Sequence, residues 1–357
     1  MKIYYYHTRP IQEALNEWEN HLHPGHILYG LTHFGKYGIT PIIHRYRRFS
    51  SRLRFSLYNF FEIMRCKEPY DLLYGTSFYG LELIIFFHAL GFYRKPIAIW
   101  HHQAVVRNSG KLKNLISRFY YKGIDQMFFF SQALIDDSLK SGKVTANQLH
   151  LIHWGADLAF YDYLKQHLPD TGKKEEKEKF FISTGKENRD FNTLLKAFSE
   201  TGLPIDIFTT PDREYEHLLK QYTSYANIRT HLTSGIIPHK LAVEVCRSKV
   251  VVICCLNYPY TVGLTTLVEA FALGLPVICS RNPKFEMDIE KEGAGIYVDY
   301  NDIEDWKQAI NYLYTHPEEA EQMGANGRKL AEQKFNLEHY SRELSEILIA
   351  TVKTYRK

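Results

Sequence analysis

The sequence predicts an α/β protein with two doubly wound domains, in each of which helices cover both faces of a parallel sheet. The chain has 357 residues, more than the roughly 250–300 residues that a single hydrophobic core usually serves. Short apolar runs alternate with segments whose apolar residues recur every three to four positions, as expected of alternating strands and helices. A charged run at 173–179 interrupts this alternation near the middle, and we expect the domain boundary just before it.

Twelve short segments have the composition of buried strands. They are 2–6, 39–44, 71–74, 97–101, 126–130 and 149–153 in the first half, and 180–183, 205–209, 228–231, 250–256, 276–280 and 295–298 in the second. We therefore predict one Rossmann-like domain over residues 1–165, a second over residues 166–335, and a helix over residues 336–357 that packs back on the first domain. Ligands of such sheets bind beyond the carboxyl ends of the strands, so we expect the site in a central cleft that both domains face.

The composition argues against disordered, membrane-spanning and disulfide-stabilised proteins. Hydrophobic residues make up 45% of the chain and charged residues 24%, which allows large cores. The longest strongly apolar segment, 83–93, is about half of the ~20 residues that a bilayer span needs, and we expect no secretory signal after Met1. Five cysteines form no C-x-x-C pair, which fits free thiols in a reducing compartment. We expect a cytoplasmic protein.

Basic residues are concentrated in the first half. Residues 31–122 contain fifteen Lys and Arg against four Asp and Glu. Within them, 44–65 and 111–122 interleave cations with aromatic and aliphatic residues. This composition is typical of helices at an anionic membrane surface, and one interpretation is that the protein lies at the inner face of the membrane. A solvated face with buried aromatics is the alternative. No nucleic-acid-binding motif accompanies these cations, so we do not expect nucleic acid as a partner.

A glutamate within an apolar helix is the first candidate for ligand binding. Gly263 precedes a helical pattern that ends at Gly274. Glu269 lies within it, and Thr265 and Thr266 share its face. A carboxylate in such surroundings needs hydrogen-bond donors, and a ligand with paired hydroxyls, such as a ribose, would supply them. A glutamate at the exposed edge of the helix is the alternative interpretation.

Two cations follow the first predicted strand of the second domain. That strand ends at Gly185, and Lys186 and Arg189 come before a helix that opens near Asp190. Cations beside the N–H groups of a helix start favour binding of an anion. Both side chains could instead be ordinary surface cations.

The pattern G-x-x-x-L-x-E-A-x-A-x-G-x-P-V-I at 263–278 resembles the nucleotide-sugar site of glycosyltransferase family 4, also called group 1, whose members have the GT-B architecture of two Rossmann-like domains. The resemblance implies that Glu269 binds the nucleotide ribose and that Lys186 and Arg189 stabilise the diphosphate during catalysis. The other positions that it assigns to the nucleotide sugar in this part of the chain are Gly185, Gly263, Leu264, Thr265 and Thr266.

Further segments resemble the family in the same order along the chain. His102 follows a strand whose terminal histidine reaches the donor sugar in the family, which implies a catalytic role. The loop at 233–239 resembles the one that meets the nucleobase, so we expect Gly235 and Ile237 near the base. Gly25 stands in a loop that resembles the one that faces acceptor and donor phosphate in the family, which implies that it lies near them. No D-x-D sequence is present, so we expect no metal at the site and a diphosphate held by cations and helix dipoles.

The resemblance implies a hexosyltransferase that needs no cofactor and moves a sugar from a nucleoside diphosphate sugar, UDP by default, to a hydroxyl of a glycan or lipid-linked acceptor in surface polysaccharide assembly. Thr261 stands where the family usually has a second glutamate. A retaining outcome is expected, and an inverting one with Glu13 or His26 as base stays open. A nucleotide-sugar epimerase and a non-catalytic partner subunit of the same architecture are the alternative functions.

Overall fold

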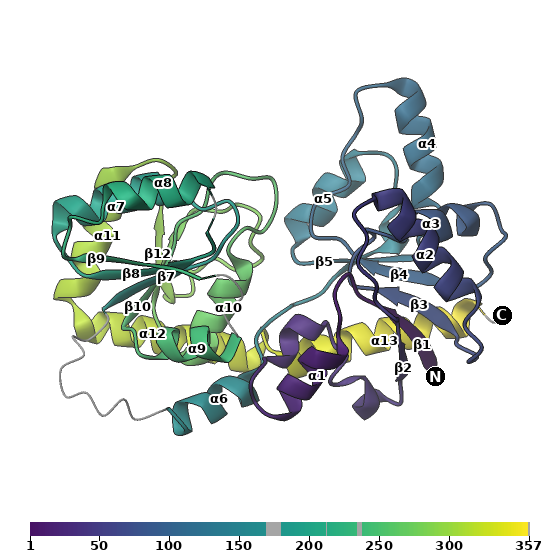
Figure 1. Ribbon diagram of the computed structural model, residues 1–357, viewed down its shortest axis with the longest axis horizontal. Helices are drawn as coiled ribbons and strands as arrows, with labels where there is room; N and C mark the ends of the chain where they lie inside the picture. Colours follow the sequence, from purple (N-terminus) through teal and green to yellow (C-terminus); the bar gives the residue numbers. More distant parts are fainter. Residues whose placement is uncertain (169–179, 212, 234–237, 356–357) are drawn as a thin grey trace. The chain divides into compact units, whose positions relative to one another are not determined.

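The computed structural model describes residues 1–168, 180–211, 213–233 and 238–355, and the charged run at 173–179 lies outside them. The chain forms two compact units (Figure 1). Unit 1 comprises Met1–Trp18, Gly25–Trp154 and Leu337–Lys357, and unit 2 comprises Glu19–Pro24 and Gly155–Asn336. Each contains a six-stranded parallel sheet with helices on both faces, which confirms the predicted fold class.

The sheet of unit 1 has the strand order β2-β1-β3-β4-β5-β6. Its strands are β1 (Lys2–Tyr6), β2 (Thr40–Ile43), β3 (Leu72–Gly75), β4 (Ile97–Trp100), β5 (Gln126–Phe129) and β6 (Leu149–Leu151). The helices of these segments are α1 (Gln12–Glu19), α2 (Arg52–Met64), α3 (Glu82–Ala89), α4 (Lys111–Tyr121), α5 (Gln132–Lys140) and α13 (Leu337–Tyr355), with short 3-10 turns η1 (Gly25–Leu28), η2 (Phe34–Tyr37) and η3 (Ala146–Gln148).

Buried tyrosines of unit 1 hold the loops at the carboxyl edge of its sheet. The hydroxyl of Tyr5 donates to the carbonyl of Leu28 at 2.9 Å, and that of Tyr74 donates to the carbonyl of Tyr29 at 2.8 Å. A buried hydroxyl needs a partner, and a loop carbonyl within reach provides one. The loop that follows η1 is therefore fixed to β1 and β3 by side chains from the core.

The sheet of unit 2 has the strand order β12-β11-β10-β7-β8-β9. Its strands are β7 (Phe181–Thr184), β8 (Ile205–Thr209), β9 (Ile228–Leu232), β10 (Val250–Ile253), β11 (Val277–Ser280) and β12 (Gly295–Val298). Its helices are α6 (Leu158–Gln166), α7 (Phe191–Thr201), α8 (Arg213–Gln221), α9 (Pro238–Cys246), α10 (Leu264–Leu273), α11 (Ile303–Thr315) and α12 (Pro317–Gln333).

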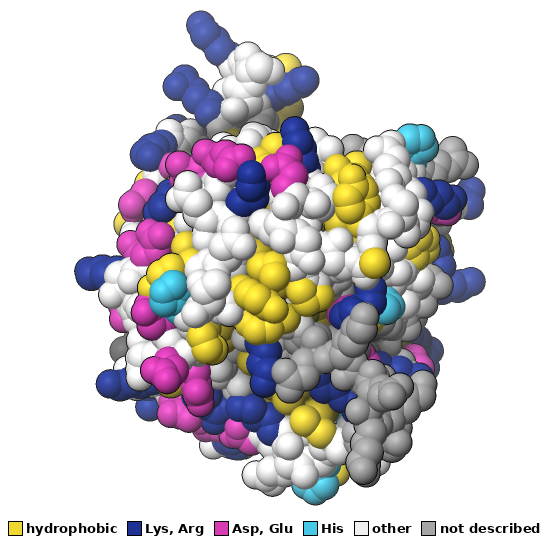
Figure 2. All heavy atoms as spheres, turned by 90° about the vertical axis from the view of Figure 1, so that its left-hand side faces the viewer, with side chains coloured by type: hydrophobic (Ala, Val, Ile, Leu, Met, Phe, Trp, Pro, Cys, Tyr) yellow, Lys and Arg dark blue, Asp and Glu magenta, His cyan; other side chains and the backbone are white. Residues whose placement is uncertain are grey.

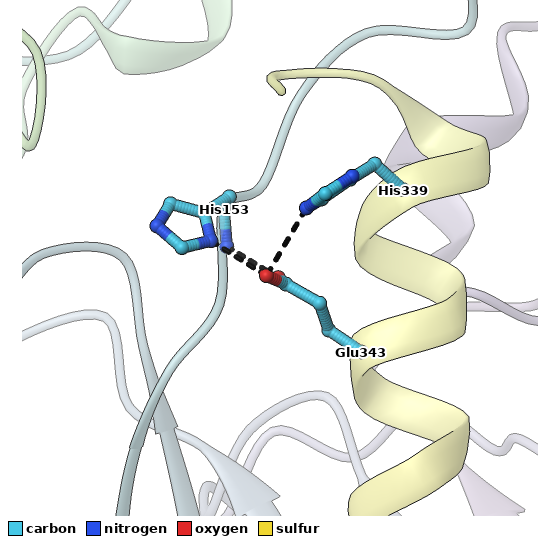
Figure 3. Close-up of side chains that lie close together, drawn as sticks. All are labelled: His153, His339 and Glu343. Atoms are coloured by element: carbon cyan, nitrogen blue, oxygen red, sulfur yellow. Dashed lines mark hydrogen bonds and ion pairs between the residues drawn. The ribbon is translucent and has the colours of Figure 1, made fainter. Parts of the chain in front are cut away.

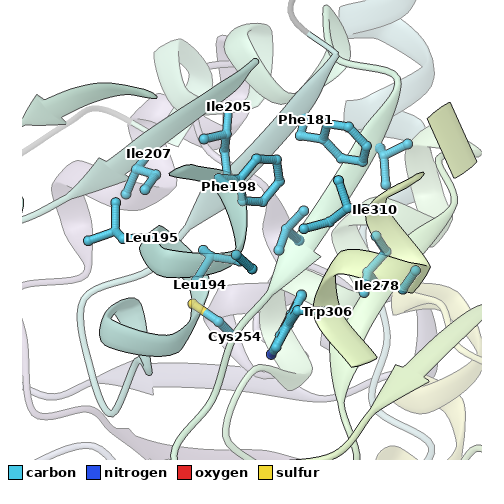
Figure 4. Packing of buried hydrophobic residues seen from close by; sticks show 14 of the residues in the cluster. Phe181, Leu194, Leu195, Phe198, Ile205, Ile207, Cys254, Ile278, Trp306 and Ile310 are labelled. Carbon is cyan, nitrogen blue, oxygen red and sulfur yellow. The ribbon is translucent and has the colours of Figure 1, made fainter. Parts of the chain in front are cut away.

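One face of the unit 2 sheet packs on α7 and α11 through a continuous apolar core (Figure 4). Phe181 and Ile205 from adjacent strands contact Phe198 of α7, and Trp306 and Ile310 of α11 complete the layer. The central strands are buried along their whole length, as expected of a parallel sheet covered on both faces. This core gives the strand ends a rigid base from which the loops of the site extend.

Helices α10 and α12 pack closely because α12 presents glycines. A Cβ atom built on Gly324 would lie 2.1 Å from the carbonyl oxygen of Gly274, and one built on Gly327 would lie 2.6 Å from the ring of Phe271. Neither distance is possible for a real side chain without movement of the backbone or the ring. The position of α10 in unit 2 thus depends on these two glycines.

All twelve predicted strands are present, but six of them are shorter than expected, and the predicted strands 149–153 and 250–256 show why. The predicted strand 149–153 ends at Leu151, because the N–H of His153 instead donates to the carboxylate of Glu343 at 3.0 Å. The predicted strand 250–256 ends at Ile253, because the carbonyl of Cys254 accepts from Asp190 at 3.3 Å and Cys255 pairs with Arg189. Both strands therefore end where their backbone turns toward a loop.

Apart from the short segment Glu19–Pro24, which belongs to unit 2, the chain passes from unit 1 to unit 2 between Trp154 and Gly155 and returns between Asn336 and Leu337. On the unit 2 side the two passages lie together, since Ala156 donates to the carbonyl of Phe335 at 3.2 Å and bridges to Asn336. All five cysteines are free thiols. Within the described part of the chain, no helix is both long enough and apolar enough to span a bilayer.

Candidate functional site

The site in unit 2 lies where the strand order of its sheet reverses. Strands β7 and β10 are neighbours in the sheet, but the chain continues from β7 toward β8 on one side and from β10 toward β11 on the other. Loops at such a switch point leave room for a ligand beyond the carboxyl ends of the strands. The loop at 185–190 follows β7, and α10 begins after the segment that follows β10.

Arg189 has a buried guanidinium beside the end of β7. Its side chain is only 7% exposed. Nε and Nη2 donate to the carbonyl of Thr184 at 3.3 Å, and Nη1 donates to the carbonyl of Glu187 at 3.1 Å and lies 3.6 Å from Sγ of Cys255. Within the part of the chain that the structure describes, these partners are carbonyls and a thiol and none of them is a carboxylate, and a buried cation favours the arrival of an anion.

The thiol of Cys255 stays protonated beside this cation. Burial raises the pKa of Cys255, and the smaller opposing effect of Arg189 does not reverse this shift. The nearest carboxylate in sequence, Asp190, is the N-cap of α7 and accepts from the N–H of Thr193 at 3.1 Å. These groups hold the guanidinium in place without forming an ion pair with it.

The loop at 185–190 is fixed to the segment that leads into α10. Asn188 has the unusual φ of 54° for a residue other than glycine. Its carbonyl accepts from the N–H of Leu256 at 2.9 Å, and its amide donates to the hydroxyl of Tyr260. The structure therefore places the loop that carries the predicted cations against the segment that leads into α10, and the binding role of these cations stays a prediction.

Gly263 is the N-cap of α10 and has φ of 91°. A Cβ atom at this position would lie 2.6 Å from Cγ2 of Ile253 and 3.0 Å from Sγ of Cys255. Only glycine combines this backbone conformation with so close an approach to β10. The predicted helix start at Leu264 and the predicted end at Gly274 are both confirmed.

Glu269 is half-buried on α10 and forms a hydrogen bond with Tyr161 of α6. Burial, followed by the charge of Glu269, raises the pKa of Tyr161 well above its ordinary value, so the hydroxyl is the donor and the carboxylate the acceptor. The sequence predicts that this carboxylate needs donors but does not identify Tyr161. Nothing in the local pattern of α6 distinguishes this tyrosine from a core residue.

The other positions predicted in unit 2 differ in exposure. Lys186 and Thr265 are exposed, Leu264 and Thr266 are buried, and Gly185 is half-buried below the guanidinium of Arg189. Gly235 and Ile237 lie outside the described residues. The predicted contact with a nucleobase therefore stays a prediction.

His102 lies at the carboxyl edge of the unit 1 sheet. Its Nε2 is 3.1 Å from the carbonyl of Thr76, so this nitrogen carries the proton that the carbonyl accepts. Burial lowers the pKa of His102, which keeps the imidazole neutral at neutral pH. In this tautomer Nδ1 is an acceptor, suited to a hydroxyl donor such as that of a sugar.

The loop that contains Gly25 begins with the 3-10 turn η1, and the predicted contact of Gly25 with phosphate stays a prediction. Gly25 is buried at the start of η1, whereas the left-handed residues of the loop are Tyr29 and Gly30, with φ of 48° and 86°. Of the two residues considered as a base, Glu13 is exposed on α1 and His26 is fully buried. A fully buried imidazole cannot contact a substrate, so the structure disfavours His26.

The comparisons with known proteins support the likeness between unit 2 and a known family. Residues 165–330 match the family model described as glycosyl transferases group 1. No curated protein sequence matches the chain. Several solved structures match it over nearly its whole length, at sequence identities that establish the fold alone.

Three of these structures illustrate the match. The protein HepE of Anabaena, solved in complex with UDP, is 15% identical, with a TM-score of 0.67 over 98% of this chain and 100% of its own; it has also been solved with UDP-glucose. A glycosyltransferase from Rickettsia africae is 14% identical, with a TM-score of 0.70 over 99% and 98%. WaaG, a glycosyltransferase involved in lipopolysaccharide biosynthesis, is 11% identical, with a TM-score of 0.64 over 97% and 99%. The chain thus has the fold of GT-B glycosyltransferases.

Proposed function

We propose that this protein is a glycosyltransferase that moves a hexose from a nucleoside diphosphate sugar to a hydroxyl of a glycan or lipid-linked acceptor. The observation that carries the proposal is the buried guanidinium of Arg189 at the switch point of unit 2, beside the start of α10. The match of residues 165–330 to the group 1 family model and the UDP bound by HepE favour a nucleoside diphosphate as the anion.

The reaction breaks the bond between the anomeric carbon of the sugar and an oxygen of the diphosphate. Negative charge then grows on the leaving diphosphate, where Arg189, Lys186 and the N-terminal end of α10 stabilise it. Glu269 accepts hydrogen bonds from the ribose hydroxyls, and Nδ1 of His102 accepts one from the donor sugar. We infer a retaining course in which the leaving phosphate oxygen takes the acceptor proton, so that no protein base is required.

The experiment measures UDP binding by calorimetry and turnover of UDP-sugars with purified full-length protein. Lys186→Ala and Arg189→Lys should each weaken UDP binding at least tenfold, which is about 1.4 kcal/mol. Lys196→Ala, which removes an exposed cation from the neighbouring helix α7, is the matched control and should bind UDP as the unaltered protein does. Unchanged UDP binding in both site variants would refute the assignment.

The products of the same assay separate the competing functions. Transfer of sugar only when an acceptor is present supports the proposal. An altered nucleotide sugar without acceptor would identify an epimerase, and absent nucleotide binding would indicate a non-catalytic subunit. The anomeric configuration of the product, read by NMR spectroscopy, distinguishes retention from inversion.

We also propose that α4 brings unit 1 to an anionic membrane at the cytoplasmic face, where lipid-linked acceptors for surface polysaccharide are found. None of the residues of α4 is buried. Leu112, Leu115 and Ile116 lie on one face of the helix and are 69%, 64% and 55% exposed. Lys111, Lys113 and Arg118 are interleaved with them. An uncovered apolar face bordered by cations fits a surface of anionic lipid.

The face drawn in Figure 2 has a different composition. On that face both acidic and basic side chains are exposed around the apolar patches. A surface with mixed charges attracts anionic lipid weakly, because attraction and repulsion largely cancel. The contrast supports α4 as the element that contacts the membrane.

A further inference from the structure

Three side chains of unit 1 converge beside the points where the chain crosses between the units. His153 follows β6 and immediately precedes Trp154, after which the chain enters the long segment of unit 2. His339 and Glu343 lie one turn apart on α13, just after the chain returns to unit 1 at Leu337. Figure 3 shows all three side chains directed at a common point. Nδ1 of His153 is 2.6 Å and Nε2 of His339 is 3.2 Å from the same carboxylate oxygen, Oε1 of Glu343.

The donor set matches the chemistry of a divalent transition metal. Two imidazole nitrogens and a carboxylate oxygen form a frequent ligand set for zinc, with a water molecule as fourth ligand. The three donor atoms lie within 4.8 Å of one another. Zinc–nitrogen bonds of about 2.0–2.1 Å require nitrogens roughly 3.3–3.5 Å apart in a tetrahedral site, so small side-chain rotations suffice. All three side chains are partly exposed, which leaves access for water.

The backbone already orients the carboxylate. The N–H of His153 donates to Oε2 of Glu343 at 3.0 Å, which leaves Oε1 directed at the two imidazoles. Such a support of a ligating carboxylate by a second hydrogen bond is common at metal sites. The position of Glu343 is thus set by a group that does not itself bind the ion.

We propose that His153, His339 and Glu343 form a binding site for a divalent transition metal ion, with zinc as the ion that suits these donors. When the metal ion binds, it takes the place of the two imidazole protons that now face Oε1. These protons move to the other ring nitrogens or to solvent. The bound ion joins segments that are 190 residues apart in sequence. It therefore closes unit 1 at the point where the chain leaves it and returns, independently of the proposed transfer reaction.

Arg342 opposes the tautomer that metal binding requires. Its Nη2 lies 3.3 Å from Nδ1 of His339 and donates to it, which places the imidazole proton on Nε2. Coordination through Nε2 needs the proton on Nδ1 instead, so Arg342, whose side chain is exposed, has to turn into solvent. Its positive charge also repels a cation. The proposal therefore predicts that loss of Arg342 favours the ion.

The first test titrates zinc into the full-length protein, freed of tags and treated with a chelator, by calorimetry at pH 7.5. One ion should bind each chain with a dissociation constant of about 10 μM or lower and should raise the midpoint of thermal unfolding. His339→Ala and Glu343→Gln should each weaken binding at least tenfold. His217→Ala, which removes an exposed histidine from unit 2, is the control and should leave binding unchanged. Absence of binding, or binding that survives both site variants, would overturn the proposal.

The second test uses Arg342→Gln, which does not remove a ligand. This variant should bind zinc several-fold more tightly than the unaltered protein, and cobalt should give the intense visible absorption of a tetrahedral nitrogen and oxygen site. If the three side chains only formed hydrogen bonds with one another and did not bind an ion, Arg342→Gln would not increase the affinity for zinc. Unchanged or weaker binding in Arg342→Gln would contradict the assigned mode of coordination.

Discussion

The guanidinium of Arg189 lies against Gly185 so closely that a Cβ atom built on the glycine would come within 2.1 Å of Nη2. Gly185 also has φ of 131°, a conformation that side chains rarely permit. The glycine therefore provides both the turn at the end of β7 and the space that the cation fills. The position of the guanidinium that we propose to bind the diphosphate therefore depends on Gly185, a residue without a side chain.

Replacement of Gly185 by alanine should weaken UDP binding by more than its effect on the stability of the fold can explain. In Gly185→Ala the methyl group displaces the guanidinium, and UDP affinity should fall at least tenfold, about 1.4 kcal/mol, by calorimetry. Gly202→Ala is the matched control, because Gly202 ends the following helix with φ of 71° and has no atom near its Cβ position. Both variants bear a backbone cost of about 1 kcal/mol. Equal UDP affinities in the two variants would show that Arg189 does not bind the diphosphate.

Glu269 should recognise the ribose through its charge. Glu269→Gln keeps the shape of the side chain but weakens acceptance from two hydroxyls, so UDP should bind about tenfold less tightly. In the unaltered protein, 2′,3′-dideoxy-UDP should show a similar loss. In Glu269→Gln the dideoxy nucleotide should lose little more, because the contact is already weakened. If the losses of affinity from Glu269→Gln and from the dideoxy nucleotide were additive, Glu269 would not contact the ribose hydroxyls.

Tyr161→Phe tests the hydrogen bond that Glu269 already accepts. This variant removes a donor that competes with the ribose, so UDP affinity should change by less than threefold. The free energy of unfolding should fall by about 1 kcal/mol, because the half-buried carboxylate then lacks this partner when no nucleotide is bound. Loss of UDP binding in Tyr161→Phe would show instead that the tyrosine positions Glu269.

The contact between α10 and α12 should not tolerate a methyl group. Gly324→Ala places Cβ 2.1 Å from the carbonyl oxygen of Gly274 and should destabilise unit 2 by about 3 kcal/mol, measured by hydrogen exchange of α10 and α12 amides. Gly35→Ala, at an exposed position of η2 with no atom near its Cβ, should leave stability within about 0.5 kcal/mol. If hydrogen exchange in Gly324→Ala were the same as in the unaltered protein, α10 and α12 could move apart at little cost in free energy.

His44 should make unit 1 less stable in acid. It is buried between the hydroxyl of Tyr4 at 2.9 Å and the amide oxygen of Asn59 at 3.1 Å, and burial lowers the pKa of His44 to about 4. The unfolded chain has a pKa of about 6.5 at this residue and binds a proton first, so stability decreases as pH falls from about 6.5 to about 4. The total loss from this group is about 3 kcal/mol.

Urea unfolding at several pH values measures this effect. In His44→Gln the decrease between pH 6.5 and 4 should be smaller by about the same 3 kcal/mol, while carboxylates titrate alike in both proteins. An identical pH dependence in the two proteins would show that His44 is protonated in the folded state.

The apolar face of α4 should control membrane binding. Leu115→Glu places a negative charge on this face, and sedimentation with vesicles that contain anionic lipid should fall at least tenfold. Tyr225→Glu changes an exposed apolar residue of unit 2 in the same way and should leave vesicle binding unchanged. Equal binding of Leu115→Glu and the unaltered protein would exclude α4 as the contact.

Features that the sequence predicts well are those with local causes. The start of α10 at Leu264 and its end at Gly274 follow from glycines that take left-handed conformations. Asp190 is the N-cap of α7, as its position before the apolar repeat indicates. The alternation of buried strands and helices likewise predicts the two sheets, because each strand needs apolar residues wherever it lies in the sheet.

Features that join distant segments have no local signal. The hydrogen bond between Tyr161 and Glu269, and the pairing of His153 with Glu343, connect residues whose proximity is set only by the packing of whole helices. The early end of β10 has the same origin, since the carbonyl of the next residue, Cys254, accepts from Asp190 at the end of the loop that follows β7. Sequence patterns predict which residues need partners, and the three-dimensional fold determines which partners they have.

The discontinuous make-up of unit 1 has a consequence for synthesis of the chain. Its helix α13 contributes the buried residues Tyr340, Leu344 and Leu348, yet it follows the whole of unit 2 in sequence. Unit 2 is fully translated once Asn336 has been added, so it can complete its core on the ribosome first. Unit 1 stays open along the surface that α13 later covers, and during that interval its nascent apolar residues are a natural substrate for chaperones.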